Sequence, residues 1–180
     1  MLVFGGSLGA GRLNEAALGL YDRWRDRGDV AVCHVSGRRG YPDCRQRLAD
    51  LRRVEDRLAY ELVEYEEHLE RRYRDATVAV CRAGAVTVAE LTVVGLPAVL
   101  VPLPGAPHDH QTRNAEALAG AGAATVLADP DASAGRVAAE LDALLADPDR
   151  LDAMSQAGRA LGRPDAAARV ADLVEEAAGA

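Results

Sequence analysis

The stretch that decides the fold is the opening of the chain, Met1–Ala16, which reads "MLVFGGSLGAGRLNEA". Its apolar run Leu2–Phe4 is typical of a buried strand, and a glycine-rich turn follows at once. A helical pattern then begins near Leu13. α/β proteins use this order of strand, glycine loop and helix to present backbone N–H groups and a positive helix end to phosphate. The stretch therefore predicts an anion-binding loop at the edge of a sheet.

The loop Gly5–Ala10 allows close approach of a ligand to the backbone, and the hydroxyl of Ser7 can donate to a phosphate oxygen. It contains neither the GxGxxG pattern of dinucleotide-binding domains nor the lysine of a P-loop. An NAD-binding domain is therefore disfavoured. The loop taken alone is equally compatible with a plain strand-to-helix turn in which Ser7 caps the helix.

Composition and charge narrow the class of protein. The chain has 180 residues, of which 49% are hydrophobic and 27% charged, as expected for one globular domain. Its formal net charge of −7 disfavours general nucleic-acid binding. No apolar run reaches the roughly 18 residues of a membrane span, and no signal-peptide pattern opens the chain. The cysteines Cys33, Cys44 and Cys81 form no CxxC motif, so we expect a cytoplasmic protein with free thiols.

Strand-like and helix-like segments alternate along the whole chain, which predicts a Rossmann-like, doubly wound parallel sheet with helices on both faces. The expected strands are Leu2–Phe4, Val30–Val35, Ala59–Val63, Thr77–Cys81, Ala98–Val101 and Ala124–Leu127. The expected helices are Leu13–Arg27, Cys44–Val54, Glu67–Arg74, Val86–Val94, Gln111–Ala119, Ala134–Ala146, Leu151–Leu161 and Asp165–Ala178. Ligands of such sheets bind outside the carboxyl ends of the strands, so function is expected in the loops that follow Phe4, Cys81 and Val101.

The second of these loops lies in "CRAGAVTVAEL", residues 81–91. Gly84 follows a buried strand and Glu90 falls in the first turns of the next helix. Two interpretations stay open. Thr87 and Glu90 have the spacing of a capping box, in which each side chain bonds to the backbone of the other. Alternatively, the Glu90 carboxylate lies over the open sheet edge and accepts hydrogen bonds from both hydroxyls of a ribose.

The third loop, "PLPGAPHDHQTRNA", is stiffened by three prolines. Asp109 is expected to cap the next helix, which leaves His110 and Gln111 in its first turn, where they could bind a polyhydroxylated ligand. A metal site at His108, Asp109 and His110 is disfavoured, because adjacent loop residues rarely converge on one ion. A nucleophilic triad around Ser7 is disfavoured too, since no partner is identifiable.

Together, "GGSLGAGRLNEA", "CRAGAVTVAEL", "GLPAVLVPLPGAPHDHQTRNA" and "GAATVL" resemble the C-terminal half of the MurG family, within glycosyltransferase family 28. The resemblance runs from residue 2 to about residue 128. It implies the C-terminal half of a GT-B glycosyltransferase, and hence one UDP-sugar (donor) binding domain over residues 1–180, with the N-terminal acceptor domain absent from the chain. The implied function is transfer of N-acetylglucosamine, with inversion, from UDP-N-acetylglucosamine to lipid I in peptidoglycan synthesis.

The resemblance also implies roles for individual residues. Ser7, with Gly6 and Gly9, would contact the diphosphate, and Glu90 the ribose hydroxyls. Main-chain groups of Tyr65 and Glu66 would hold uracil, although Glu66 replaces an apolar residue common in the family. The remaining implied donor-site residues are Arg82, Gly84, Ala85, Val86, Thr87, His110 and Gln111, of which Arg82 is expected to brace the loops and Gln111 to read the sugar.

No catalytic base, metal or cofactor is expected in this chain. The base and the lipid I site are implied to belong to the missing domain, and the whole enzyme to lie on the cytoplasmic face of the inner membrane without a transmembrane segment. The chain alone is therefore expected to be inactive.

Three alternatives remain: the donor-binding subunit of a split transferase with a separate membrane-bound partner, a non-enzymatic nucleotide-sugar binding module, and a sugar epimerase of related architecture, which the "GGSLGA" loop disfavours.

Overall fold

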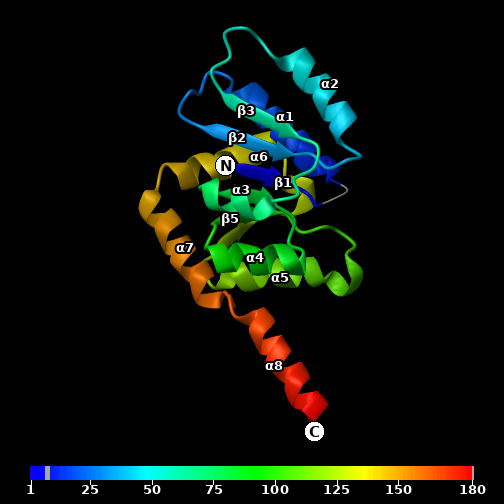
Figure 1. The fold of residues 1–180 in the computed structure, drawn as a ribbon. Helices are drawn as coiled ribbons and strands as arrows, with labels where there is room; N and C mark the ends of the chain where they lie inside the picture. Colours follow the sequence, from blue (N-terminus) through cyan, green and yellow to red (C-terminus); the bar gives the residue numbers. More distant parts are fainter. Residues whose placement is uncertain (7–8, 180) are drawn as a thin grey trace.

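Six parallel strands form a single sheet in the order β3-β2-β1-β4-β5-β6 (Figure 1). The structure is a computed structural model that describes residues 1–6 and 9–179. The strands are β1 (Leu2–Phe4), β2 (Ala31–Val35), β3 (Ala59–Val63), β4 (Ala79–Cys81), β5 (Ala98–Leu100) and β6 (Ala124–Val126). β1 is central, because Val3 pairs with His34 of β2 on one side and with Val80 of β4 on the other. The strand order thus reverses between β1 and β4.

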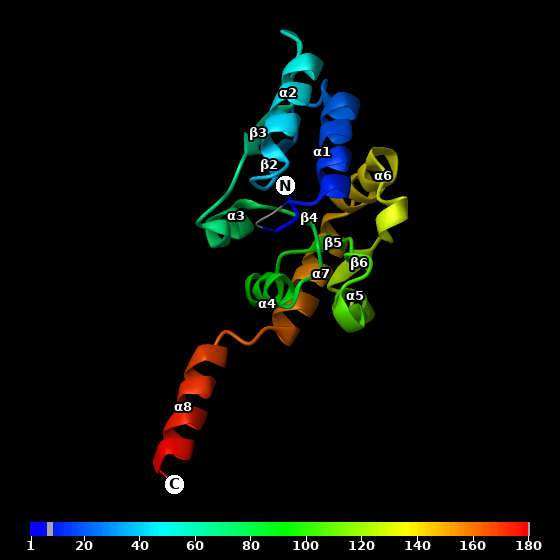
Figure 2. The ribbon, with the colours of Figure 1, turned by 90° about the vertical axis from the view of Figure 1, so that its right-hand side faces the viewer.

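Helices cover both faces of the sheet, as the two views in Figures 1 and 2 show. They are α1 (Gly11–Trp24), α2 (Tyr41–Leu51), α3 (Leu69–Asp75), α4 (Ala85–Val94), α5 (His110–Gly120), α6 (Ala134–Leu145), α7 (Pro148–Leu161) and α8 (Ala166–Gly179), with short 3-10 turns at Pro107–Asp109 and Asp129–Asp131. Side chains alternate along β1: Val3 packs into a core with α1, α2 and α6, whereas Leu2 and Phe4 pack into a second core with α3, α4 and α5. Two buried faces explain the continuously apolar strand sequences.

The predicted fold class is confirmed, and every expected strand and helix is present, with ends that match or differ by up to three residues. α2 begins three residues early, at Tyr41 rather than Cys44, because Pro42 is accepted in a first helical turn. α7 begins at Pro148, where the Asp147 carboxylate accepts a hydrogen bond from the Arg150 amide at 3.0 Å. Such caps set helix starts more sharply than apolar periodicity does.

A buried polar network ties β2 to α1 and β3. The Asn14 amide oxygen and the Tyr60 hydroxyl contact the two ring nitrogens of His34 at 3.0 and 2.9 Å. The Asn14 amide nitrogen donates to the Ser36 carbonyl at 3.0 Å. These contacts fix the turn after β2 against the helix that follows the glycine loop.

The last helix, α8, is exposed along its described length and extends away from the sheet in both views (Figures 1 and 2). Gly162–Asp165 link it to α7. Within residues 1–6 and 9–179, no helix is long and apolar enough to cross a membrane.

The buried His34 predicts a specific pH dependence of stability. Burial lowers the pKa of His34 from 6.5 to about 4, so between these values the unfolded chain binds a proton at this ring that the native chain does not. Stability should therefore fall as pH decreases from 6.5 towards 4, by about 1.4 kcal/mol per pH unit at the steepest point. Urea unfolding of wild type and His34→Gln at pH 7, 6 and 5 measures this, and the variant should lack that part of the slope. Parallel pH dependences in the two proteins would contradict the assignment.

Candidate functional site

A pocket of about 320 Å³ opens at the point where the strand order reverses. It lies between the carboxyl end of β1, the loop after β3, helix α3 and the first turns of α4. Its lining residues are Phe4, Gly6, Val35, Tyr65, Glu66, Glu67, Leu69, Glu70, Tyr73, Val86, Thr87 and Glu90. Six of the residues predicted from the sequence are therefore brought together: Gly6, Tyr65, Glu66, Val86, Thr87 and Glu90.

The glycine loop needs glycine for two physical reasons. Gly6 and Gly9 have φ of 89° and 81°, in the left-handed region that side chains disfavour. A Cβ added to Gly9 would also lie 2.1 Å from the carbonyl oxygen of Ser36, so the loop packs directly on the turn after β2. The Gly9 amide donates to the Gly6 carbonyl at 2.9 Å. The predicted role of Ser7 lies outside the described residues.

Helix α4 begins at the pocket with its first N–H groups uncapped by side chains. Gly84 occupies the N-cap position with extended backbone and, among the described residues, no side chain bonds to this helix start. The amides of Ala85, Val86 and Thr87 have no partner within the helix, and the helix dipole makes this end positive. The capping-box interpretation of Thr87 and Glu90 is wrong, because Thr87 is the third residue inside α4 rather than its cap. The N-terminus of α4 is thus available to an anion.

Glu90 projects from the exposed side of α4 and lines the pocket. Its Oε2 accepts a hydrogen bond from the hydroxyl of Tyr73 on α3 at 3.0 Å. Tyr73 is buried and its ring lies 5.7 Å from that of Phe4, centroid to centroid. Burial, with the nearby Glu90 carboxylate, raises the pKa of Tyr73, so the hydroxyl keeps its proton and acts as the donor.

The loop after β3 forms the opposite wall of the pocket. Glu66 turns its carboxylate to the Arg72 guanidinium (Oε2 to Nε, 2.7 Å) and to the His68 amide (3.1 Å). The Arg72 contact and the amide hold the pKa of Glu66 below its usual range. Arg38 stacks over the Tyr65 ring, 4.5 Å from its centroid. Glu66 therefore belongs to a polar brace for the loop.

The apolar part of the pocket wall comes from other positions. Phe4 and Val35 supply it from the ends of two neighbouring strands, and Leu69 supplies it from the first turn of α3. An apolar surface beside the main chain of Tyr65 and Glu66 is therefore present despite the glutamate. Such a surface suits the flat face of a base.

Arg82 and Gln111 brace the loops that flank the pocket and are not among its lining residues. Arg82 donates through Nη1 to the carbonyls of Val101 and Pro102, both at 3.0 Å, and lies 2.6 Å from Asp129 Oδ1, a close ion contact without hydrogen-bond alignment. The Gln111 Oε1 accepts from the Ala83 amide at 3.2 Å and the Leu103 amide at 3.0 Å. Within residues 1–6 and 9–179, no hydrogen bond engages its amide nitrogen, which keeps two donors for a ligand.

The start of α5 differs in detail from the expectation. Asp109 occupies the N-cap position with a φ of 53°, but its carboxylate accepts from the Thr112 hydroxyl at 2.7 Å rather than from a backbone amide. His110 is exposed, with Nδ1 2.8 Å from the Pro107 carbonyl, and no other described residue bonds to its Nε2. Within the described part of the chain, no group of three His, Cys, Asp or Glu side chains is arranged to hold a metal ion.

Larger hollows lie elsewhere on the surface. One of about 410 Å³ is lined by residues including Met1, Cys33, Glu61 and Ala76, towards the amino ends of the strands. Parallel sheets bind ligands at the opposite, carboxyl edge, so the smaller pocket at the strand-order reversal is the functional candidate.

Sequence reasoning missed Tyr73, Leu69 and Glu70, all on α3. The signal was present in "HLERRYRD", since Leu69 and Tyr73 are four residues apart and share a helix face. Nothing in that spacing indicates that the Tyr73 hydroxyl meets Glu90, because that contact joins two different helices.

Comparison of the chain with known proteins shows the family to which it belongs. Residues 1–170 match the model of the glycosyltransferase family 28 C-terminal domain. The chain belongs to this family. It is similar to the Alkalilimnicola ehrlichii protein named UDP-N-acetylglucosamine--N-acetylmuramyl-(pentapeptide) pyrophosphoryl-undecaprenol N-acetylglucosamine transferase, with 45% identity over 99% of this chain and 48% of that protein. A relative of the same name from Salinibacter ruber is 43% identical over 95% of this chain and 44% of its own length.

A solved structure agrees with the sequence relatives. The crystal structure of Acinetobacter baumannii MurG superposes with a TM-score of 0.80 and 31% identity, covering 97% of this chain and 51% of that one. This family 28 chain therefore spans about half the length of the curated relatives it matches.

The brace at Arg82 predicts a loss of stability when it is removed. Arg82→Met keeps most of the aliphatic stem but leaves two carbonyls and the mostly buried Asp129 without their main cation, so we expect destabilisation of about 2–4 kcal/mol. Arg136→Met is the matched control. It breaks an exposed i,i+4 pair with Glu140 and should cost only about 0.3–0.5 kcal/mol. Equal losses in urea unfolding would show that Arg82 is no brace.

Proposed function

We propose that this chain is the donor-binding half of an inverting N-acetylglucosaminyltransferase. In this proposal the complete enzyme moves N-acetylglucosamine from UDP-N-acetylglucosamine to undecaprenyl-pyrophosphoryl-N-acetylmuramyl-pentapeptide, lipid I, in peptidoglycan synthesis. The single observation that carries it is the pocket in which the uncapped start of α4 and the Glu90 carboxylate line one wall. The names of relatives at 43–45% identity supply the donor and the acceptor.

The pocket offers each part of a UDP-sugar a suitable surface. The start of α4, Gly84–Thr87, and the glycine loop at Gly6 would hold the diphosphate through N–H groups and the helix dipole. Gly9, whose amide donates to the Gly6 carbonyl, would set the turn that brings this loop to the diphosphate. Glu90 would accept both ribose hydroxyls. The main chain of Tyr65 and Glu66 would pair with uracil, whose face would lie against the apolar wall.

The sugar end would extend towards α5. There the amide nitrogen of Gln111 and the Nε2 of His110 keep hydrogen-bonding capacity, while their other polar atoms are engaged with the backbone. Arg82 would act indirectly, by holding the loop after β5 in which these side chains are set.

The chemistry would be a single displacement at the anomeric carbon. The acceptor hydroxyl forms a new C–O bond as the bond to the diphosphate oxygen breaks, and UDP departs with an additional negative charge. The positive end of α4 and its N–H groups would stabilise that charge where it develops. The hydroxyl proton must go to a base, and no residue of this chain is assigned that role.

The acceptor site and the base would lie in the other half of the enzyme. Because the acceptor named in the relatives is an undecaprenol derivative, a membrane lipid, the complete enzyme would work at the membrane surface, on its cytoplasmic face. In the alternative of a split transferase, the donor-binding half and the acceptor-binding half would be separate chains.

Donor binding predicts measurable affinity for UDP that depends on Glu90. Wild type should bind UDP and UDP-N-acetylglucosamine weakly in calorimetric titrations and should not bind NADH. Glu90→Gln should weaken UDP binding roughly tenfold or more, because charge-assisted hydrogen bonds contribute about 1.5–3 kcal/mol each. Its melting temperature should stay nearly unchanged, since Glu90 is exposed.

Glu70→Gln is the matched control for that variant. Glu70 lines the same pocket and carries the same charge, so its loss should not weaken binding of an anionic ligand. Equal weakening by both variants, or no effect of Glu90→Gln, would overturn the ribose role. Failure of wild type to bind millimolar UDP would overturn the donor site itself.

Transfer should require the other half of the enzyme. This chain alone should give no product from UDP-N-acetylglucosamine and lipid I, because positioning of the acceptor supplies much of the rate in a two-substrate transfer. Adding the missing half of a close relative as a separate chain should restore activity if the halves dock. Turnover by the purified chain alone would contradict the proposal, and UDP binding without restored transfer would favour a non-enzymatic binding module.

A further inference from the structure

The hydrogen bond between Tyr73 and Glu90 joins two helices across the pocket wall. Tyr73 is only 2% exposed, whereas Glu90 lies at the surface of α4. We propose that Tyr73 is a positioning residue, which holds the Glu90 carboxylate in the orientation that accepts the ribose hydroxyls of a nucleoside diphosphate. This inference rests on the proposed function and extends it to a residue that does not itself need to touch the ligand.

The physical case begins with the freedom of an exposed glutamate. Fixing such a side chain costs rotamer entropy, which an unrestrained Glu90 would lose on binding. The bond from Tyr73 fixes one carboxylate oxygen before the ligand arrives. A carboxylate has about four lone-pair sites, so one bond at Oε2 leaves room for two hydroxyls. Preorganisation of this kind increases affinity by lowering the cost of binding.

Tyr73 is suited to this task by what surrounds its ring. Its ring packs at 5.7 Å and a tilt of 52° on Phe4, the last residue of β1 before the glycine loop. Leu69 contributes to the same core from one turn earlier on α3. The hydroxyl is therefore held in place by packing from β1 and α3. Tyr73 thus connects β1, which leads into the glycine loop, with the Glu90 carboxylate on α4.

The Tyr73 hydroxyl is the group that orients the Glu90 carboxylate by a hydrogen bond. Within residues 1–6 and 9–179, the hydroxyl of Tyr73 is the hydrogen-bond donor that reaches the Glu90 side chain. Glu67 and Glu70 line the same pocket and carry the same charge as Glu90, so they repel it rather than hold it. Arg72, which lies on α3 like Tyr73, forms ion pairs with Glu61 and Glu66 instead.

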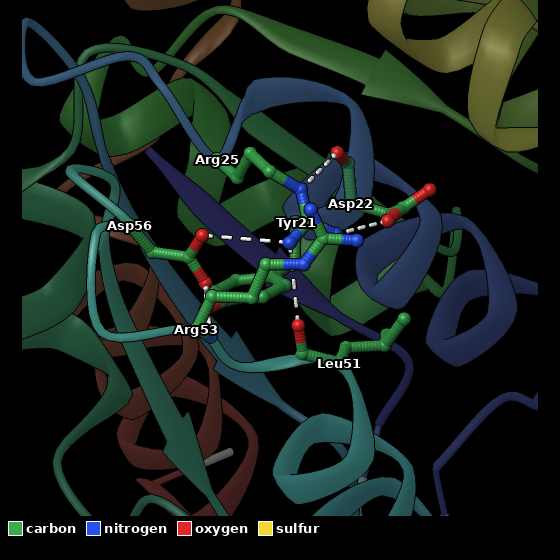
Figure 3. Close-up of polar contacts among 6 residues, drawn as sticks. All are labelled: Tyr21, Asp22, Arg25, Leu51, Arg53 and Asp56. Carbon is green, nitrogen blue, oxygen red and sulfur yellow. Dashed lines mark hydrogen bonds and ion pairs between the residues drawn. The ribbon is translucent and has the colours of Figure 1, made fainter.

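A second tyrosine–carboxylate pair provides a matched control remote from the pocket. The Tyr21 hydroxyl on α1 donates to the Asp56 carboxylate, which also contacts Arg25 and the backbone amide of Arg53 (Figure 3). Neither Tyr21 nor Asp56 lines the pocket at the strand-order reversal. Tyr21→Phe therefore removes the same kind of bond, from a buried tyrosine to a carboxylate, without touching the proposed site.

The test compares binding of UDP and 2′-deoxy-UDP by calorimetry in wild type, four single variants and one double variant. Tyr73→Phe, which keeps the ring on Phe4, should weaken UDP binding about tenfold and reduce the preference for UDP over 2′-deoxy-UDP. Glu90→Asp keeps the charge but draws the carboxylate away from the Tyr73 hydroxyl, so it should lose the same preference. Because this variant leaves the packing of the Tyr73 ring unchanged, its result does not depend on whether Tyr73→Phe folds. Tyr21→Phe should leave both affinities at the wild-type value. In a Glu90→Ala background, adding Tyr73→Phe should change UDP affinity no further, because Tyr73 acts through Glu90.

The outcomes separate this inference from the proposed function. If Glu90→Ala loses the ribose preference but Tyr73→Phe and Glu90→Asp keep it, the positioning role is overturned and the donor site stands. If Tyr73→Phe weakens UDP and 2′-deoxy-UDP equally, its role is structural only and the inference fails. If wild type itself shows no preference for UDP over 2′-deoxy-UDP, the ribose assignment and the inference fail together.

Discussion

The reversal of strand order between β1 and β4 is the constraint on which the site depends. Helix α1, which follows β1, packs on one face of the sheet, and α4, which follows β4, packs on the other. The two chain segments therefore diverge as they leave neighbouring strands, and a crevice opens between them. The glycine loop, the uncapped start of α4 and the loop after β3 all meet at that crevice because parallel strands carry their carboxyl ends to one edge.

Much of the fold could be predicted because the physics that specifies it is local. Val78–Cys81 and Ala98–Val101 are continuously apolar because their strands are covered on both faces, and this pattern is visible without a structure. Gly9 was identifiable as a loop residue, and its contact with the Ser36 carbonyl supplies the reason. Some helix ends were less predictable: α7 begins three residues before the expected Leu151, because the Asp147 carboxylate caps it through a single hydrogen bond.

The site was only partly predictable because its side chains are oriented by contacts between distant segments. Glu90 could be singled out in its motif, but the choice between a helix cap and a ligand-binding carboxylate depends on Gly84 starting α4 and on Tyr73 reaching across from α3. The engagement of Glu66 with Arg72 likewise could not be predicted, because it joins the loop after β3 to a side chain of α3. Arg82 lies outside the pocket lining and donates to the Val101 and Pro102 carbonyls, a contact between the ends of two strands that no sequence pattern indicates. Ribose, uracil and sugar contacts stay predictions.

The central claim is that a UDP-sugar occupies the crevice at the reversal point, and the position of bound UDP tests it most directly. Backbone amide chemical shifts recorded during titration of this chain with UDP should change at Gly6, Gly9, Tyr65, Glu66 and the first turn of α4. Each of these segments borders the crevice or its glycine loop. Changes confined to the larger hollow around Cys33, Glu61 and Ala76 would place the ligand at the amino edge of the sheet and contradict the account.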